Sequence, residues 1–436
     1  MKRAQDAKLD IRYLWSFDKP FRGEELLVIL NERAKQIRSL SIVLPTTEFN
    51  TVGHTLLSTS LASARFVTLA AVPQGWEDEA DIVDPSIEEL FGNDAPELRY
   101  LRLQKIGLPW TISQFSKLTT IMLDKCHFTN PTPNADFITI LETLPSLRQL
   151  QLNDCRSLCR PGPLISDYFV DLPELQVAQL DGLRLRDMTQ ILSVLKTSPS
   201  LRLVGKLRFR EDEAVTFSHL NLPEISSLDT ICDLEVEIQH NNLRTVDSVS
   251  LTGSSVKSGS NKNFQFSLSG VVSHVFPTLC DPFRFTRLRR LSLNWIQCGW
   301  GTPILVGDGF DVVQPAHTES DVLLYFLHRC PDIVSLKLCG SHPDILDVLS
   351  QSVEGAATTP PCTKLHTLVL DRASVTDDSL RNLVLRRPGC VNLRSLTLST
   401  SNGFKKDTVL WLRERIEDVC WDNEANNVTT FDPPSP

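Results

Sequence analysis

Leucine and other apolar residues recur along the chain in one short pattern. An apolar residue is followed by two more, three and five positions later. In each copy the second and third apolar positions alternate with polar residues, as in a strand that is buried on one face. Clear copies begin at Leu98, Leu118, Leu147, Leu175, Leu288, Ile333, Leu365 and Leu393, and weaker ones at Ile37, Leu201 and Ile225. The pattern predicts a series of short strands that share one interior.

The spacing of the copies indicates a repeat protein. The first positions from Leu98 to Leu175 are 20, 29 and 28 residues apart, and Leu365 and Leu393 are again 28 apart. These steps match the leucine-rich-repeat period of about 20–29 residues. Helical spacing of apolar residues precedes several copies, over 136–144, 188–196 and 320–329. We therefore predict an α/β leucine-rich-repeat solenoid, a ribonuclease-inhibitor-like horseshoe with a parallel concave sheet and outer helices.

The ends of such a solenoid need caps, because its terminal cores are otherwise exposed. We expect an N-terminal capping helix region over 1–36, repeats over 37–404, a C-terminal capping helix over 405–420 and a flexible tail over 421–436. The repeat pattern decays over 205–287, where strands are expected at 234–238 and 264–268 with a flexible loop at 253–261. Two degenerate repeats are preferred there to an inserted hairpin.

Composition and charge limit the classes of partner. The formal net charge is −9, whereas nucleic-acid binding needs a basic surface, so no nucleic-acid partner is expected. No apolar run approaches the length of about 20 residues that crosses a bilayer, and Met1 to Lys8 does not resemble a secretory signal. We expect a cytoplasmic or nuclear protein that makes no membrane contact and is monomeric outside a complex.

Catalytic and metal-binding motifs are missing from the sequence. It contains no G-x-S-x-G elbow, no C-x-x-C pair and no phosphate-binding loop. The 11 cysteines are scattered, as expected for free thiols, and Cys126 and Cys155 occupy turn positions that are typical of buried core thiols. We therefore expect a protein that is not an enzyme, with no catalytic residues, no cofactor and no metal.

The polar residues that alternate with the leucines are the candidate binding residues, because they point to the concave side of the predicted sheet. Tyr100, Arg102 and Arg290 are the favoured anchors, since tyrosine and arginine are enriched where binding energy concentrates. The full set is Tyr100, Arg102, Gln104, Met122, Asp124, Gln149, Gln151, Asn153, Gln179, Asp181, Arg290, Asn294, Lys337 and Asp371.

Three stretches carry a family resemblance. Leu118 to Cys126 and Leu147 to Cys155 have the leucine-rich form with cysteine in the asparagine-or-cysteine slot, and Leu365 to Leu380 resembles the cysteine-type repeat of F-box proteins. The segment from Leu90 to Trp110 is similar to F-box-like leucine-rich-repeat proteins of mushroom-forming fungi, although no F-box is recognisable before Ile37.

This resemblance implies the substrate-recognition subunit of an SCF-type E3 ubiquitin ligase. Its repeats would hold a substrate protein as a ubiquitin ligase adaptor, with Skp1 as a further partner if an F-box lies upstream. Two alternatives stay open. One is a stand-alone leucine-rich-repeat scaffold or inhibitor without a ubiquitin-ligase link, and the other is an enzyme whose site lies in the irregular region 205–287.

Overall fold

The computed structural model divides the chain into two compact units. The first consists of Met1–Arg208 and Ile225–Ser227, and the second of Phe209–Glu224 and Leu228–Pro436. The structure describes residues 7–15, 23–73, 90–109, 115–129, 137–156, 158, 169–197, 200–208, 231–241, 247–255, 262–270, 285, 287–298, 327–328, 330–340, 346, 349, 362–373, 375–386, 393–399 and 404–422.

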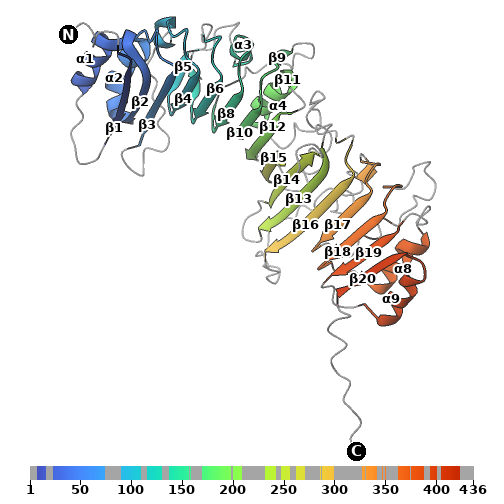
Figure 1. Cartoon of the computed structure of the whole chain (residues 1–436). Helices are drawn as coiled ribbons and strands as arrows, with labels where there is room; N and C mark the ends of the chain where they lie inside the picture. Colours follow the sequence, from blue (N-terminus) through green and yellow to red (C-terminus); the bar gives the residue numbers. More distant parts are fainter. Residues whose placement is uncertain are drawn as a thin grey trace, which may run out of the picture. The chain divides into compact units, whose positions relative to one another are not determined.

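The first unit is built on a sheet in which each strand pairs in parallel with the next one along the chain (Figure 1). Among the described residues its strands are, in spatial order, β1 (Leu9–Leu14), β2 (Ile37–Pro45), β3 (Phe66–Val72), β4 (Tyr100–Gln104), β6 (Thr120–Asp124), β8 (Gln149–Asn153), β10 (Val177–Leu183) and β12 (Arg202–Arg208). Spatial order follows chain order, so each successive segment adds one strand to the same edge.

Helices and short strands connect these strands. The helices are α1 (Gly23–Arg33), η2 (Ala34–Gln36), α2 (Thr46–Ser58), η4 (Leu90–Asn93), α3 (Phe137–Glu142) and α4 (Leu185–Val194). In the described part of this unit, two short parallel pairs accompany them, β5 (Gly107–Pro109) with β7 (His127–Thr129) and β9 (Val170–Leu172) with β11 (Leu195–Thr197). Helix α2 contacts β2, β3 and α1, and it buries Phe49, Leu56 and Leu57 completely.

The second unit contains a sheet of mixed direction. Its described strands are, in spatial order, β15 (Lys262–Gly270), β14 (Asp247–Ser255), β13 (Ile231–Asn241), β16 (Arg290–Cys298), β17 (Ser335–Cys339), β18 (Thr367–Asp371), β19 (Ser395–Ser399) and β20 (Asp418–Trp421). The first three pair antiparallel, and pairing from β13 through β16 to β20 is parallel. Helices α8 (Asp377–Arg386) and α9 (Lys406–Arg413) contact each other beside this sheet.

Aligned apolar rows form the core of each unit. In the first unit, one row of apolar side chains at equivalent positions of adjacent strands is at most 2 % exposed. This row consists of Leu40, Val67, Leu101, Ile121, Leu150, Ala178 and Leu203. In the second unit the matching row consists of Leu234, Leu291, Leu336, Leu368 and Leu396. Because one such leucine contributes about 1.5–3 kcal/mol on burial, these rows are the main source of stability.

Backbone hydrogen bonds recur at both ends of the strands. Before β6, the amides of Thr119 and Thr120 both donate to the carbonyl oxygen of Arg99, at 2.8 and 3.0 Å, and the same paired contact occurs at β4, β8 and β10. After the strands, Lys105, Lys125 and Asp154 adopt positive φ angles of 56°, 51° and 48°. Lys105 and Lys125 donate their amides to the carbonyl oxygen of the last residue of the following strand, Asp124 and Asn153 respectively, and Asp154 donates to that of Asp181 within β10. Successive segments are therefore joined by the same backbone contacts whatever their side chains.

The structure confirms an α/β fold with mostly parallel strand pairing, an arrangement compatible with a solenoid. Every clear copy of the apolar pattern falls on a strand of the described residues, namely β4, β6, β8, β10, β16, β17, β18 and β19. The predicted helices over 136–144 and 188–196 overlap α3 and α4, but α4 ends at Val194, and the last two residues of the second prediction belong to β11. The weak copy at 225 and nearly all of the helix predicted over 320–329 lie outside the described residues.

Two predictions about the irregular and terminal regions were wrong. An antiparallel β13–β14–β15 arrangement stands where two degenerate repeats were preferred to a hairpin, and residues 253–255 of the expected loop belong to β14. A Cβ atom on Gly253 would lie 2.9 Å from Ile231 and 3.3 Å from Phe264, so the missing side chain allows this close pairing. The capping helix expected over 405–420 ends at Arg413, and Asp418–Trp421 forms β20, with Val419 and Trp421 buried at a two-residue period.

The N-terminal region differs from its expected form as well. Strand β1 precedes the predicted helix, and that helix ends at Arg33, with a single 3-10 turn over Ala34–Gln36. Strand β1 extends the sheet by pairing with β2, so residues 9–14 are part of the sheet as well as of the predicted capping region.

The one-sided core makes a direct prediction for two neighbouring residues of β8. Leu150 is 0 % exposed, whereas Gln151 lies on the opposite face. Leu150→Ala should lower the free energy of unfolding by about 2–5 kcal/mol through lost burial and a residual cavity. Gln151→Ala should change it by no more than about 0.5 kcal/mol. Urea denaturation followed by circular dichroism measures both, and equal effects would contradict the one-sided core.

Candidate protein-binding face

The predicted binding residues all lie on strands, on the face opposite the leucine rows. All of them are partly or well exposed, while the residues between them are buried. The structure does not bring them together into one described site, because four of them, Arg290, Asn294, Lys337 and Asp371, belong to the second unit. The other predicted residues form one surface on the first unit, which we call the unit-one face.

Strand register arranges the unit-one face in three rows that cross the strands. The first row contains Asp10, Ser39, Phe66, Tyr100, Thr120 and Gln149. The middle row contains Arg12, Ser41, Thr68, Arg102, Met122, Gln151 and Gln179. The third row contains Gln104, Asp124, Asn153 and Asp181. The rows differ in chemistry, since the aromatic groups lie in the first, which also contains Asp10, the arginines lie in the middle one, and two carboxylates lie in the third.

Aromatic and sulfur side chains are in contact near the middle of this face. The hydroxyl group of Tyr100 donates to the Met122 sulfur at 3.3 Å. The Tyr100 ring also lies beside Phe66, with 6.4 Å between the ring centroids. Phe66 is 47 % exposed, which is unusual for so large an apolar side chain. Exposed rings held by neighbours are typical anchors of protein interfaces.

The third row concentrates negative charge at the carboxyl ends of the strands. Partial burial raises the pKa of the Asp124 carboxyl, and the neighbouring Asp154 adds to this shift while Lys125 opposes it. Asp181 accepts a hydrogen bond from Nε2 of Gln179 at 2.6 Å. The Asn153 Oδ1 atom is buried without a hydrogen-bond partner in the described part of the chain. The carboxylates of Asp124 and Asp181 are therefore the acceptors that this row offers to a donor-rich partner.

The candidate residues of the second unit are largely paired with each other. Arg290 binds Asp233 through both carboxylate oxygens, which raises the pKa of the guanidinium. Asn294 donates from Nδ2 to Oε1 of Glu235 at 3.0 Å, and Lys337 lies 3.8 Å from Asp371. Arg290, expected to be a favoured anchor, is therefore already engaged by an acidic group of its own sheet.

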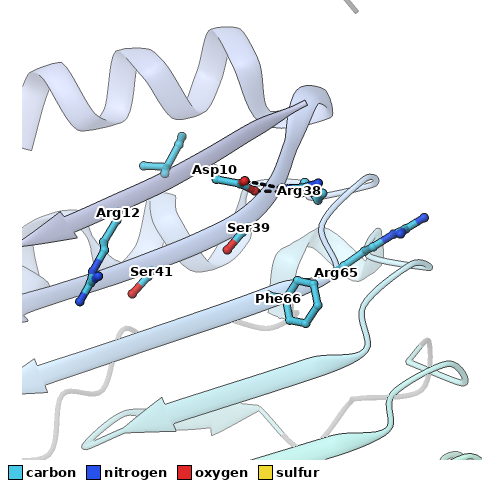
Figure 2. A pocket seen from close by; sticks show the side chains of 8 residues that line it. Asp10, Arg12, Arg38, Ser39, Ser41, Arg65 and Phe66 are labelled. Carbon is cyan, nitrogen blue, oxygen red and sulfur yellow. Dashed lines mark hydrogen bonds and ion pairs between the residues drawn. The ribbon is translucent and has the colours of Figure 1, made fainter. Parts of the chain in front are cut away.

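A hollow on the first three strands was missed by the sequence analysis (Figure 2). It has a volume of about 400 Å³ and is lined by Asp10, Ile11, Arg12, Arg38, Ser39, Ser41, Arg65 and Phe66. Arg38 holds Asp10 through both side-chain oxygens, with 3.0 Å between Nε and Oδ1. Alternating apolar and polar residues over 9–14 and 66–72 could have indicated the strands beneath this hollow. The copy of the apolar pattern at β3 begins with Ala64 instead of a leucine or isoleucine, so it was not recognised.

Burial explains the two conspicuous thiols. Cys126 and Cys155 are free and buried, and each donates to a strand carbonyl oxygen, of Leu103 and Leu123 respectively, at 3.4 Å. Desolvation raises the pKa of Cys126 to about 12 and that of Cys155 well above its ordinary value. Both are therefore protonated at neutral pH and confirm the expected core thiols, because nucleophilic chemistry requires the thiolate.

The described residues contain no grouping of three or more His, Cys, Asp or Glu side chains able to hold a metal ion. Within the same residues, no helix has the length and apolar character needed to cross a bilayer. Neither a protein-family model nor a functionally characterised protein matches the chain in sequence.

The raised pKa of Asp124 predicts a pH-dependent effect on stability. A carboxyl group with a raised pKa in the folded state favours folding while it is protonated and loses that contribution as pH rises through its pKa. Asp124→Asn should therefore raise the melting temperature at pH 7. The gain in the free energy of unfolding should be less than about 1 kcal/mol, because the carboxyl group is partly exposed. At pH 3 the variant and the original chain should melt together. A larger gain at pH 3 than at pH 7 would refute the assignment.

Proposed function

We propose that the chain is a leucine-rich-repeat protein that binds another protein along the unit-one face and performs no bond chemistry. The recurring strand length, the left-handed residue after several strands and the stacked leucine rows support the repeat assignment. The curvature that would make this face concave is part of the same proposal, because stacked repeats of this kind present extended binding surfaces.

The single observation behind this function is the composition of the unit-one face. Aromatic, thioether, amide and arginine side chains are aligned on strands whose other side is a packed core. Partner binding favours such side chains, particularly when the scaffold is rigid, because little conformational entropy is then lost on association. Residues on β4, β6, β8 and β10 would contact the partner, with Tyr100 and Arg102 as anchors.

The particular role we propose is that of a substrate-recognition subunit of an SCF-type ubiquitin ligase. Support comes from the sequence resemblance to F-box-like repeat proteins. In this role the unit-one face holds the substrate, and an F-box would bind Skp1. The protein would be found in the cytoplasm or nucleus.

A stand-alone scaffold or inhibitor is the second candidate, and one observation favours it. Strand β1 pairs in parallel with β2 over Leu9–Leu14, and α1 packs on α2. The described residues before Ile37 are thus engaged in the repeat sheet and its flank, rather than forming a separate helical module. Binding to Skp1 separates the two roles.

Site-specific photo-crosslinking tests the proposed face. A photoreactive phenylalanine at Gln151 or Gln179 should crosslink one and the same protein in cells that express the chain. The matched control at Glu142, which is exposed on α3, should give no such product. Crosslinking of that protein at equal yield from all three positions would contradict the assignment of the unit-one face.

Copurification with Skp1 tests the ligase role separately. The full-length gene product should bind purified Skp1 at micromolar concentration or below. If the gene product does not bind Skp1, while the photoreactive residue at position 151 still crosslinks a partner protein, the stand-alone role is the correct one.

A further inference from the structure

Positive charge collects at the hollow on the first three strands and beside it. Arg12, Arg38 and Arg65 line the hollow (Figure 2). Arg102 continues the middle row on the neighbouring strand β4. Asp10 is the acidic group of the lining, and it is bound to Arg38. Glu97, the carboxylate near Arg65, is bound to Lys117 at 2.6 Å.

The arginines flank an apolar surface. Phe66 is one of the lining residues of the hollow; its ring lies beside Tyr100, which in turn contacts Met122. Between Arg12 and Arg102 the middle row contains the hydroxyl groups of Ser41 and Thr68. The surface thus combines cations at two ends, polar hydroxyls between them and an aromatic row alongside.

We propose that this patch, defined as Arg12, Arg65, Phe66, Tyr100 and Arg102, binds an extended acidic segment of the partner protein. The inference rests on the proposed function and names the partner's chemistry at one part of the unit-one face. Carboxylates of the segment contact Arg12 and Arg102, as charge complementarity requires. An apolar side chain between them packs on Phe66 and Tyr100.

Strand spacing sets the length of the segment. Arg12 on β1 and Arg102 on β4 are separated by three steps of the sheet, which at about 4.8 Å a step is about 14 Å. An extended chain advances about 3.4 Å per residue. Two carboxylates about four residues apart therefore match the two arginines. The side chain midway between them lies over Ser41 and Thr68, and a phenylalanine there packs sideways onto the aromatic row alongside.

A protein segment fits this surface better than a nucleic acid does. The spacing between Arg12 and Arg102 is too wide for one phosphate group, and the third row of the same face contains Asp124 and Asp181. A nucleic acid would need a continuous basic track, and the net charge of the chain is −9. Carboxylates spaced along a peptide contact the cations without covering the acidic row.

Fluorescence anisotropy with the full chain tests the proposal. The probe is a fluorescein-labelled peptide with the core Asp-Ser-Phe-Ser-Asp between Gly-Ser flanks. It should bind, and Arg12→Glu, Arg102→Glu or Phe66→Ser should each weaken binding by about tenfold or more. The matched control Arg202→Glu reverses an exposed arginine on β12 of the same face and should leave the affinity unchanged.

Three further measurements show whether the change in anisotropy comes from the carboxylates of the peptide. A peptide with Asn in place of both Asp residues should lose binding, and the signal should fall with added salt, as expected for exposed charges. A single-stranded oligonucleotide should not compete, and competition by it would overturn the choice of a peptide partner. Melting temperatures of the variants show that each remains folded.

Other outcomes also separate this inference from the proposed function. Absence of peptide binding at about 1 mM, or equal binding by the Arg12→Glu and Arg202→Glu variants, overturns the acidic-segment proposal. If crosslinking from Gln151 still captures the partner, the unit-one face is retained as a binding surface. If both experiments fail, the proposed function fails with it.

Discussion

Parallel pairing in register is the constraint on which the rest of the structure depends. Each strand of the first unit places its apolar residues beside those of the preceding strand, so that the leucines of distant segments share one interior. A shift by one residue would exchange the two faces of a strand and bury groups such as Arg102 or Gln151. The same register therefore creates both the core and the polar rows, so the proposed binding face follows directly from how the core is packed.

Much of the fold could be predicted from the apolar rhythm, because leucine at the first repeat position marks the start of a strand. Ala64 lacks that bulk, and β3 was missed although its own residues alternate. Pairing direction is not encoded in alternation, so β13, β14 and β15 could not be recognised as antiparallel before their partners were known. Short apolar runs fit helix and strand alike, which explains why the residues of β20 were assigned to a helix.

The candidate site was predictable only in part, because its side-chain contacts join strands that are far apart in the sequence. Alternation within one strand identifies which residues face solvent, and the exposure of Tyr100, Gln151 and Asp181 agrees with it. Contacts between strands depend on register across long separations. Arg290 and Asp233 are 57 residues apart, and Asp10 and Arg38 are 28 apart. The hollow beside Phe66 arises from three strands together, so no local sequence pattern indicates it.

Zero-length carbodiimide crosslinking of the native chain tests the stacked register most directly. Lys117 and Glu97 lie at equivalent positions before β6 and β4, and Lys364 and Asp332 lie likewise before β18 and β17; each pair is in ion-pair contact. Mass spectrometry should identify amide crosslinks within both pairs, lost in Glu97→Gln and Asp332→Asn. If these lysines instead couple to other carboxylates and never to these two, the account of consecutive strands packed side by side is wrong.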